Sequence, residues 1–322
     1  MTVVRDTPPS PAVTVIVVNW NVRNLLRECL RSIDAQRRRP ASDYEVIVVD
    51  NASTDDSASM VRREFPWVTL VENSDNVGFA RANNQAHALA RGHHVLLLNP
   101  DTVVLDGALD RMIDFLEVHG DVGALGCRLL NSDGSYQRWT AGAFPTIGRT
   151  ARHAFFLDLV FGARLGSRSL FLNRDVQVDL DVDWVSGACM ALRREALVDR
   201  IFDDSFFMYG EDTELCDRLH QAGWRVVYSP SASVVHHHGK SMAQQSGAIL
   251  LTAFKGPRAF YIRRHSRTTV WLYDLLLATG FGIRWACYLA LSVLPKRRTV
   301  FRARAASSRS YMTRALRVMV GQ

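Results

Sequence analysis

Short apolar runs and amphipathic segments alternate along about the first 120 residues of the chain. The apolar runs are rich in β-branched residues, which is typical of strands that are buried on both faces of a parallel sheet. The predicted strands are residues 13–19, 44–50, 67–73 and 93–105. The segments with helical spacing that follow them are residues 22–36, 58–65, 76–90 and 107–120. Four such alternations predict an α/β fold with a doubly wound, mostly parallel sheet of the kind that binds nucleotides.

Polar side chains stand where these predicted strands end. Asn19 closes the first apolar run, Asp50 closes the second, and Asp101 follows the apolar part of the fourth. Ligands of doubly wound sheets bind beyond the carboxyl ends of the strands. The pattern therefore predicts a ligand site near these three residues.

The regular alternation stops near residue 123. Residues 122–130 predict another strand, and residues 182–195 predict a strand that leads into a helix. Residues 131–180 carry scattered Gly, Arg and aromatic residues without a clear period. We therefore expect residues 1–12 to be a leader, and the segment after residue 122 to have an architecture of its own.

The last part of the chain is both apolar and basic. Residues 270–294 are long enough to span a bilayer, but they contain Asp274 and Arg284, each of which costs about 2.5–3.5 kcal/mol near the centre of a spanning helix. Residues 255–322 carry fourteen Lys or Arg and one acidic residue, a net charge of +13, whereas the preceding residues carry a net charge of −6. We expect residues 249–322 to form an amphipathic helical extension that lies on an anionic membrane surface rather than crossing it; a solubilising tail is the simpler alternative.

Composition sets two further limits. The 322 residues are 48% hydrophobic and 22% charged, so the chain can bury a sizeable core. The five cysteines include no C-x-x-C pair, which argues against a disulfide framework or a zinc site and suits a reducing compartment. The first residues lack the basic region and apolar run of a signal peptide. Both observations favour a cytoplasmic protein.

Two adjacent carboxylates, Glu211 and Asp212, follow a glycine in an aromatic-rich stretch. They would suit the first turn of a helix, where the positive end of the helix dipole favours acidic side chains. Alternatively, one of them is a catalytic base. The local pattern leaves both interpretations open.

Candidate ligands for a metal and a nucleotide lie at strand ends. Asp101, in the tripeptide N-P-D, can hold a divalent cation against a diphosphate, although N-P-D is also a common turn sequence. Asp50 can accept hydrogen bonds from a nucleobase or ribose, or it can cap a helix. Three histidines follow an apolar run, and imidazole is a common metal ligand. Of these, His236 and His238 share one face of an extended chain.

Seven segments in this order resemble the inverting family 2 glycosyltransferases of the GT-A fold, in the branch that includes bacterial rhamnosyltransferases and galactofuranosyltransferases. The segments are VIVVNWN, VVDNASTDDS, ENSDNVGFARANN, LLLNPDTVV, DWVSGACMALRRE, FMYGEDTELCDRLHQAGWRV and VVHHHGKS. The resemblance implies a GT-A catalytic domain at residues 13–248. Its nucleotide-binding half would be residues 13–122, and its acceptor-binding half residues 123–248.

The resemblance also implies roles for particular residues. Asp212 occupies the position of the catalytic base, and Glu211 would orient it or the acceptor and raise its pKa. Asp101 takes the place of the last acid of the family's D-x-D motif and would hold Mg²⁺ or Mn²⁺ together with His236, with His238 as the reserve ligand. The residues implied to bind the nucleotide sugar are Asn19, Asn21, Asp50, Ser53, Asn76, Gly78, Arg81, Asn83, Asn99 and Asp101, of which Asn99 departs from the first acid of D-x-D. Those implied to contact the acceptor or the donor sugar are Trp184, Ser186 and Gly187.

The implied reaction is the transfer of L-rhamnose from dTDP-L-rhamnose, with inversion, to a hydroxyl of a lipid-linked or cell-envelope saccharide. Galactofuranosyl or other hexosyl transfer from a UDP-sugar is the alternative donor chemistry. A nucleotidyltransferase is disfavoured because no early Gly-rich loop is present, and a polymerising synthase because no array of spanning helices or Q-x-x-R-W motif is present. A non-catalytic subunit of a polysaccharide assembly complex is disfavoured because Asp101, Asp212 and a histidine are retained. We expect a peripheral protein at the inner face of the cell membrane, without a nucleic-acid partner, and we leave a homo-oligomer open.

Overall fold

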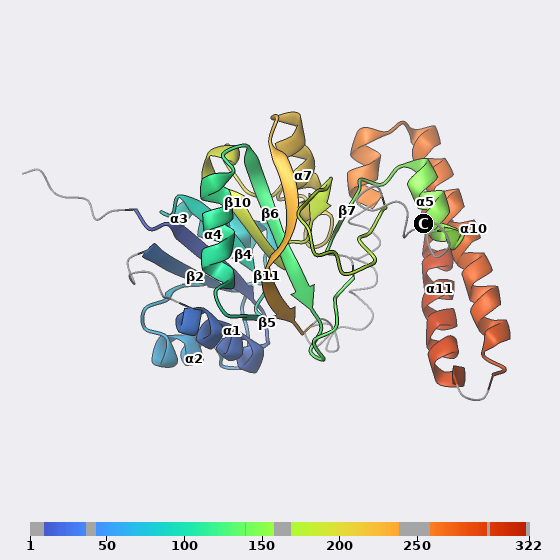
Figure 1. Cartoon of the computed structure of the whole chain (residues 1–322). Coiled ribbons are helices and arrows are strands. Elements are labelled where there is room, and N and C mark those ends of the chain that lie inside the picture. The colour runs from blue at the N-terminus through green and yellow to red at the C-terminus, as the bar shows by residue number, and fades with distance from the viewer. Residues whose placement is uncertain are drawn as a thin grey trace, which may run out of the picture.

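The computed structural model describes residues 10–36, 43–138, 140–157, 169–237, 258–294 and 297–319. In this part of the chain, a mixed sheet of nine strands is flanked by helices, and a helical hairpin stands beside it (Figure 1). The predicted α/β fold, with its mostly parallel central sheet and its C-terminal helical extension, is confirmed.

The first half of the sheet is parallel and is built around β1 (Val13–Asn19). β1 pairs with β2 (Tyr44–Asp50) on one side and with β4 (His94–Leu98) on the other, and β3 (Thr69–Glu72) extends the sheet beyond β2. The register places Asn19 opposite Asp50. Because the strands are parallel and in register, their polar ends meet at one edge of the sheet, as predicted.

The predicted fourth strand is two strands, which corrects the expectation of one strand over residues 93–105. β4 ends at Leu98, the chain turns through Asn99–Asp101, and β5 (Thr102–Val104) pairs antiparallel with β11 (Arg225–His236) at the other end of the sheet. Pro100 has no backbone N–H, so it ends the ladder of β4. The pairing sets Thr102 opposite His236, and so brings the N-P-D segment beside the histidines.

The second half of the sheet mixes strand directions. The strand order is β3-β2-β1-β4-β10-β6-β11-β5. β10 (Cys189–Arg193) runs antiparallel between β4 and β6 (Val122–Leu130), and β11 runs parallel to β6. β8 (Leu180–Asp181) pairs with β11, and β7 (Ala141–Gly142) forms a separate pair with β9 (Trp184–Val185). One sheet therefore crosses the expected boundary at residue 122, while the domain limits themselves stay predictions.

The segment predicted as a strand leading into a helix, residues 182–195, also differs from the prediction. It contains β9 and β10, separated at Ser186–Ala188, and ends in a single 3₁₀ turn, η3 (Arg194–Ala196). The guanidinium of Arg193 donates to the carbonyls of Val122 and His119, at 3.1 and 3.0 Å. These tertiary hydrogen bonds hold the segment extended against the sheet, overriding its helical pattern.

Helices cover both faces of the sheet. They are α1 (Arg23–Gln36), α2 (Ser57–Glu64) and α4 (Ala108–Val118) on one face, and α3 (Phe79–Leu89) and α7 (Glu211–Gln221) on the other. Alternate residues of β1 divide accordingly: Val15 and Val17 pack in the first core, and Ile16 and Val18 in the second. Burial on both faces explains the continuous apolar runs of the parallel strands.

The C-terminal hairpin consists of α10 (Arg267–Leu291) and α11 (Arg298–Met319). Phe281 of α10 stacks on Tyr311 of α11, with their ring centroids 4.9 Å apart. α10 also packs on α5 (Ile147–Ala154), where Gly280 leaves no room for a Cβ atom, because such an atom would lie 2.4 Å from Cβ of Ala154. In the described part of the chain, α10 is the one helix whose length and apolar composition would suffice to cross a membrane.

A short helix at residues 258–264 links the hairpin to α7 and to the loop that precedes α7. Arg263 forms an ion pair with Asp203 at 2.7 Å, just before the aromatic-rich stretch. Arg264 forms an ion pair with Asp217 on α7. At the other end of the short helix, Arg258 pairs with Asp274 of α10 at 2.7 Å. Arg258 thus ties the short helix to the hairpin, while Arg263 and Arg264 tie it to the loop before α7 and to α7 itself.

Candidate active site

A cradle of hydrogen bonds forms at the carboxyl ends of β1 and β2. Asn19 Nδ2 donates to Asp50 Oδ1 at 2.7 Å and to Ser53 Oγ at 3.1 Å. Ser53 Oγ also accepts from the backbone N–H of Asn21, at 2.9 Å. Among the described residues, Asn19 Oδ1 is buried without a hydrogen-bond partner. A buried, fixed acceptor of this kind is expensive unless a ligand satisfies it, so the cradle suits a donor group of a nucleobase or ribose.

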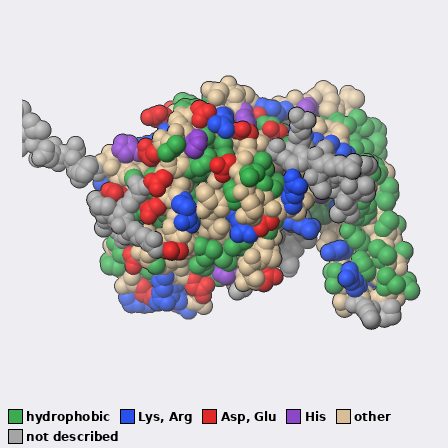
Figure 2. All heavy atoms as spheres, viewed as in Figure 1, with side chains coloured by type: hydrophobic (Ala, Val, Ile, Leu, Met, Phe, Trp, Pro, Cys, Tyr) green, Lys and Arg blue, Asp and Glu red, His purple; other side chains and the backbone are tan. Residues whose placement is uncertain are grey.

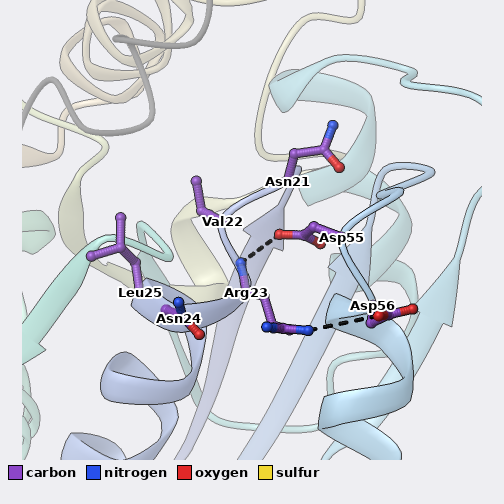
Figure 3. Close-up of a pocket in the computed structure, with 7 residues that line it drawn as sticks. All are labelled: Asn21, Val22, Arg23, Asn24, Leu25, Asp55 and Asp56. Carbon is purple, nitrogen blue, oxygen red and sulfur yellow. Dashed lines mark hydrogen bonds and ion pairs between the residues drawn. The ribbon is translucent and has the colours of Figure 1, made fainter.

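An open cavity of about 500 Å³ adjoins this cradle at the start of α1 (Figure 3). Its lining residues are Asn21, Val22, Arg23, Asn24, Leu25, Asp55 and Asp56. Asp55 accepts a hydrogen bond of 2.7 Å from the backbone N–H of Arg23, and the Arg23 guanidinium lies 3.7 Å from the Asp56 carboxylate. Asn21 belongs to both the cradle and the cavity, so the cavity extends the candidate nucleotide site outward.

The start of α3 touches the loop that precedes the acidic pair. Gly78 has φ +89°, and a Cβ atom there would lie 2.7 Å from Cδ2 and 2.9 Å from the carbonyl oxygen of Phe207. The N–H of Gly78 donates to Asn76 Oδ1 at 3.0 Å, and the N–H of Phe79 donates to the Phe207 carbonyl at 2.8 Å. Asn76 and Gly78 therefore shape the junction between the cradle and the α7 side of the site.

Two residues predicted from the same motif lie differently on α3. Arg81 is exposed. Asn83 is buried and donates to the Phe79 carbonyl at 2.9 Å, one turn earlier in the helix. Its amide group is thereby engaged within α3, so a nucleotide contact for Asn83 stays a prediction.

The candidate metal position lies between β4 and the end of β11. Asp101 and His236 are both buried, with Oδ1 of Asp101 3.2 Å from Nε2 of His236. Nδ2 of Asn99 lies 3.4 Å from the same imidazole nitrogen. On the other side of the ring, Nδ1 of His236 lies 2.8 Å from Oε1 of Gln137. The residues predicted to bind the metal therefore come together, with Gln137 behind them.

This arrangement fits a divalent cation. If Nδ1 of His236 donates to Gln137 Oε1, the ring is held in the tautomer whose Nε2 can ligate, and such outer hydrogen bonds are usual for metal-bound histidines. Among the described residues, no group of three or more His, Cys, Asp or Glu could hold a metal. Asp101 and His236 would thus supply only part of the coordination. Mg²⁺ ordinarily takes its remaining ligands from substrate phosphates and water.

The other two histidines of the triplet have different positions. Nδ1 of His237 lies 2.7 Å from Ser132 Oγ, and its Nε2 lies 3.9 Å from the Glu28 carboxylate on α1. The backbone N–H of His237 donates to the carbonyl of Asp101 at 2.8 Å. The reserve ligand, His238, lies outside the described residues.

The acidic pair opens α7, as the helix-start interpretation predicts. Gly210, at φ +93°, precedes the helix, and Glu211 and Asp212 are its first two residues. Asp212 Oδ1 accepts from the N–H of Thr213 at 2.7 Å, and Oδ2 accepts from the N–H of Gly187 at 3.4 Å. Glu211 is buried, and its Oε2 has no hydrogen-bond partner among the described residues.

These environments separate the two carboxyl groups. Loss of hydration raises the pKa of Asp212, while its hydrogen bonds from backbone N–H groups favour the ionised form. Burial raises the pKa of Glu211 well above its usual range, and the charge of Asp212 raises it further. The expectation that the charge of Glu211 raises the pKa of Asp212 stays a prediction. Because the backbone N–H groups of Thr213 and Gly187 donate to Asp212 and Glu211 Oε2 has no such donor, we expect the proton of the pair on Glu211.

Tyr209 lies two residues before Glu211 and has acidic neighbours. Burial raises its pKa to about 12, and the neighbouring acidic groups Glu211, Asp101 and Asp212 add to the shift. Tyr311 of α11 contributes as well. Tyr209 also has a left-handed backbone, with φ +68°. One tyrosine thus lies within electrostatic range of both ends of the site and of the C-terminal hairpin.

The residues expected to contact a sugar lie beside Asp212. Gly187 supplies the backbone N–H described above, and Ser186 Oγ accepts from the N–H of Ala188 at 3.3 Å. Trp184 is buried, donates from Nε1 to the Ala143 carbonyl at 3.3 Å, and packs edge-on against Phe171. Ser186 and Gly187 therefore lie beside Asp212, whereas Trp184 packs in the hydrophobic core behind them.

Sequence reasoning missed several residues of the site. Asn51, beside Asp50, is buried, and its Oδ1 accepts from Asn73 Nδ2 at 2.8 Å. Gln137 and Tyr209 complete the surroundings of His236 and the acidic pair. Asn51 stands in the same strand-end motif as Asp50 and could have been found there, whereas Gln137 lies in a segment without a period and carried no such signal.

Comparison with known proteins identifies a family. The family model described as "Glycosyl transferase family 2" matches residues 14–200, which is more than half of the chain. An N-acetylglucosaminyl-diphospho-decaprenol L-rhamnosyltransferase of Mycobacterium tuberculosis is 30% identical over 264 residues, covering 78% of this chain and 84% of that protein. Rhamnosyltransferase WbbL of Escherichia coli is 27% identical over 239 residues, covering 70% of this chain and 84% of that protein.

A solved structure supports the fold. Mannosyltransferase PcManGT from Pyrobaculum calidifontis, in complex with GDP-Man and Mn²⁺, superposes with a TM-score of 0.60 at 22% identity. The superposition covers 95% of this chain and 88% of that protein. At this identity the likeness concerns the fold, and it agrees with the GT-A architecture expected from the motifs.

Proposed function

Because the chain belongs to glycosyl transferase family 2, we propose that it transfers L-rhamnose from dTDP-L-rhamnose, with inversion, to a hydroxyl of a lipid-linked saccharide. The observation that carries the reaction type is the position of Asp212 at the start of α7, where its carboxylate accepts hydrogen bonds from the N–H groups of Thr213 and Gly187. The printed names of two relatives support the sugar, since both are rhamnosyltransferases. One of these names also supports a prenyl diphosphate sugar as acceptor.

Asp212 is the proposed general base. Its ionised carboxylate takes the proton of the acceptor hydroxyl while the acceptor oxygen attacks the anomeric carbon. A bond forms between that oxygen and the anomeric carbon, and the bond from the anomeric carbon to the diphosphate breaks, its electron pair leaving with dTDP. Attack from the face opposite the diphosphate inverts the configuration. Glu211 keeps its proton and leaves the negative charge on Asp212.

The nucleotide would lie along the edge of the parallel strands. Asn19 and Asp50 would bind the base or ribose, and the diphosphate would extend toward Asp101. When bound there, Mg²⁺ or Mn²⁺ offsets the charge that develops on the diphosphate. Asp101 and His236 would hold the cation, and Gln137 would keep the imidazole ring in the ligating orientation.

A lipid-linked acceptor places the reaction at a membrane. We assign the protein to the cytoplasmic face of the cell membrane as a peripheral enzyme, where sugar nucleotides and the saccharide end of the acceptor meet. The basic charge of the last part of the chain supports this placement.

The test is a donor screen followed by product analysis. Thermal shift with dTDP, UDP and GDP, with and without Mn²⁺, should show the largest metal-dependent stabilisation with dTDP. The enzyme should then convert dTDP-L-rhamnose and a prenyl diphosphate N-acetylglucosamine into a disaccharide whose new linkage has the inverted configuration by NMR. Preference for UDP would replace rhamnosyl with galactofuranosyl or another hexosyl transfer. Binding without turnover of any donor would favour the non-catalytic subunit.

A further inference from the structure

The two charged residues inside α10 both face the protein. Asp274 is 1% exposed and accepts from Nε and Nη2 of Arg258, at 2.9 and 2.7 Å. Arg284 donates from Nε to the Ala154 carbonyl at 3.0 Å, and its guanidinium lies 4.5 Å from the centre of the Phe156 ring. After Arg267, these are the only charged residues of the helix. The opposite face of α10 therefore carries no charge along its length.

That outer face is apolar and exposed. Leu272 and Ile283 are 39% and 43% exposed, and Trp271 and Leu289 are each 50% exposed. Leu272, Ile283 and Ala290 recur at helical spacing along one side of the helix. Figure 2 shows hydrophobic side chains along this hairpin, which stands beside the nine-stranded sheet and its flanking helices in Figure 1. A patch of this extent on a folded protein marks an interaction surface.

The partner helix α11 is cationic. It contains six arginines and no acidic residue; they are Arg298, Arg302, Arg304, Arg309, Arg314 and Arg317. Five of these are exposed. Three of the five, Arg298, Arg302 and Arg309, follow one another at spacings of four and seven, which places them on one side of the helix. The hairpin thus combines an uncharged apolar helix with an arginine-rich one.

We propose that the α10–α11 hairpin docks flat on an anionic lipid surface, with the outer face of α10 in the headgroup region and the arginines of α11 on the lipid phosphates. An apolar helix face paired with a cationic one is the combination that binds lipid interfaces. This inference deepens the proposed function, on which it rests in one respect: the acceptor lipid would lie in the same membrane.

Two other occupants fit the hairpin less well. A spanning α10 would have to leave Arg258 and α5, or would draw α11 and its arginines into the bilayer, because α10 and α11 pack along each other through contacts such as Phe281 on Tyr311 and Gly282 on Met312. A second copy would meet this surface through the same patch in a two-fold contact. The arginine-rich helices of the two copies would then approach each other and repel.

The hairpin also lies close to the reaction centre. The helix at residues 258–264 joins the two, because its Arg258 pairs with Asp274 of α10 and its Arg264 pairs with Asp217 of α7, the helix that begins with Glu211. Docking through this hairpin would therefore bring the lipid surface next to the acidic pair, where a lipid-linked hydroxyl must arrive.

The experiment is vesicle flotation of the full chain without donor or acceptor, so that a failure of docking is distinguishable from a failure of sugar transfer. Vesicles of phosphatidylcholine are compared with vesicles in which part of it is replaced by phosphatidylglycerol. The first double variant is Leu272→Ser with Ile283→Ser, and the second is Arg302→Gln with Arg309→Gln. The matched control is Leu89→Ser with Val118→Ser, which are 50% and 77% exposed on α3 and α4. Circular dichroism checks that each variant is folded.

The wild type should float with the phosphatidylglycerol vesicles and dissociate as salt is added. The arginine variant should bind about thirtyfold more weakly, the apolar variant about tenfold or more weakly, and the control as the wild type. Equal binding by all variants would overturn the inference, as would release of the wild type by detergent alone. A dimer that dissociates in the apolar variant, without vesicle binding by the wild type, would assign the face to a second copy instead.

Discussion

The acidic pair at the start of α7 makes the sharpest prediction, because the two carboxyl groups are expected to carry different protonation states. Asp212→Asn removes the base and keeps the size of the side chain. A positioned base contributes about 10²–10⁴-fold to a rate, which corresponds to about 3–5.5 kcal/mol of activation free energy. Asn can still accept the 2.7 Å hydrogen bond from Thr213 and loses only the long contact with Gly187. The variant should therefore fold and bind nucleotide normally while turnover collapses.

Glu211→Gln should behave in the opposite way, because a buried, protonated glutamate is closely mimicked by glutamine. Turnover should stay near the wild-type value. The rate rises with pH as Asp212 ionises, and burial raises the pKa of Asp212. This acid limb should lie at the same pH in the variant if Glu211 is already neutral. If instead the charge of Glu211 raised the pKa of Asp212, the limb would move to lower pH.

The stability of Glu211→Gln provides an independent check. The pKa of Glu211 is raised in the folded state, so its contribution to stability is fully present below the unfolded-state pKa and is lost as the pH rises toward the folded-state value. The variant should therefore be more stable than the wild type near neutral pH, and not below the ordinary pKa of a glutamate.

The assay measures release of dTDP from dTDP-L-rhamnose across the pH range, with thermal shift by dTDP as the control for binding. Thermal unfolding is followed at acid and at neutral pH. Two results would refute the reasoning. One is turnover by Asp212→Asn above about a tenth of the wild-type rate, since a base contributes at least 10²-fold. The other is loss of activity in Glu211→Gln equal to that in Asp212→Asn.

Three further substitutions test other parts of the molecule. Asp101→Ala and His236→Ala should each reduce the stabilisation by dTDP in the presence of Mn²⁺; unchanged stabilisation, together with wild-type activity in EDTA, would contradict the metal assignment. Asp274→Asn should lower the free energy of unfolding in urea by about 2–4 kcal/mol, because it leaves the mostly buried Arg258 without its counter-charge. Gly78→Ala should lower the free energy of unfolding by about 1–3 kcal/mol, because of a strained positive φ and the contact with Phe207. It should also weaken dTDP binding. An unchanged free energy of unfolding would show that the loop around Phe207 moves to make room.

The parallel half of the sheet and its polar edge could be predicted because both depend on local signals. Each buried strand is a continuous apolar run, and the residue at its end is polar. Parallel pairing in register then sets Asn19 opposite Asp50 without further information. The start of α7 at Glu211 was equally predictable, because a glycine and a cluster of acids are typical of a helix N-terminus.

The rest depends on contacts between distant segments, which a local pattern does not record. β5 separates from β4 because it pairs with β11, more than a hundred residues away in the chain. Gln137 reaches His236 across a similar distance from an irregular segment. The protonation of the acidic pair depends on burial and on the hydrogen bonds to Asp212. The sequence of two adjacent acidic residues shows neither.

The three arginines of the helix at residues 258–264 have a consequence for the choice of acceptor. Arg258 holds α10, while Arg263 and Arg264 hold the loop before the acidic pair and α7 itself. If α10 rests on the membrane, these ion pairs fix the height of Asp212 above the lipid. The enzyme would then select an acceptor by the distance of its hydroxyl from the bilayer. A saccharide that is one sugar too short or too long would be a poor acceptor, even with the right terminal sugar.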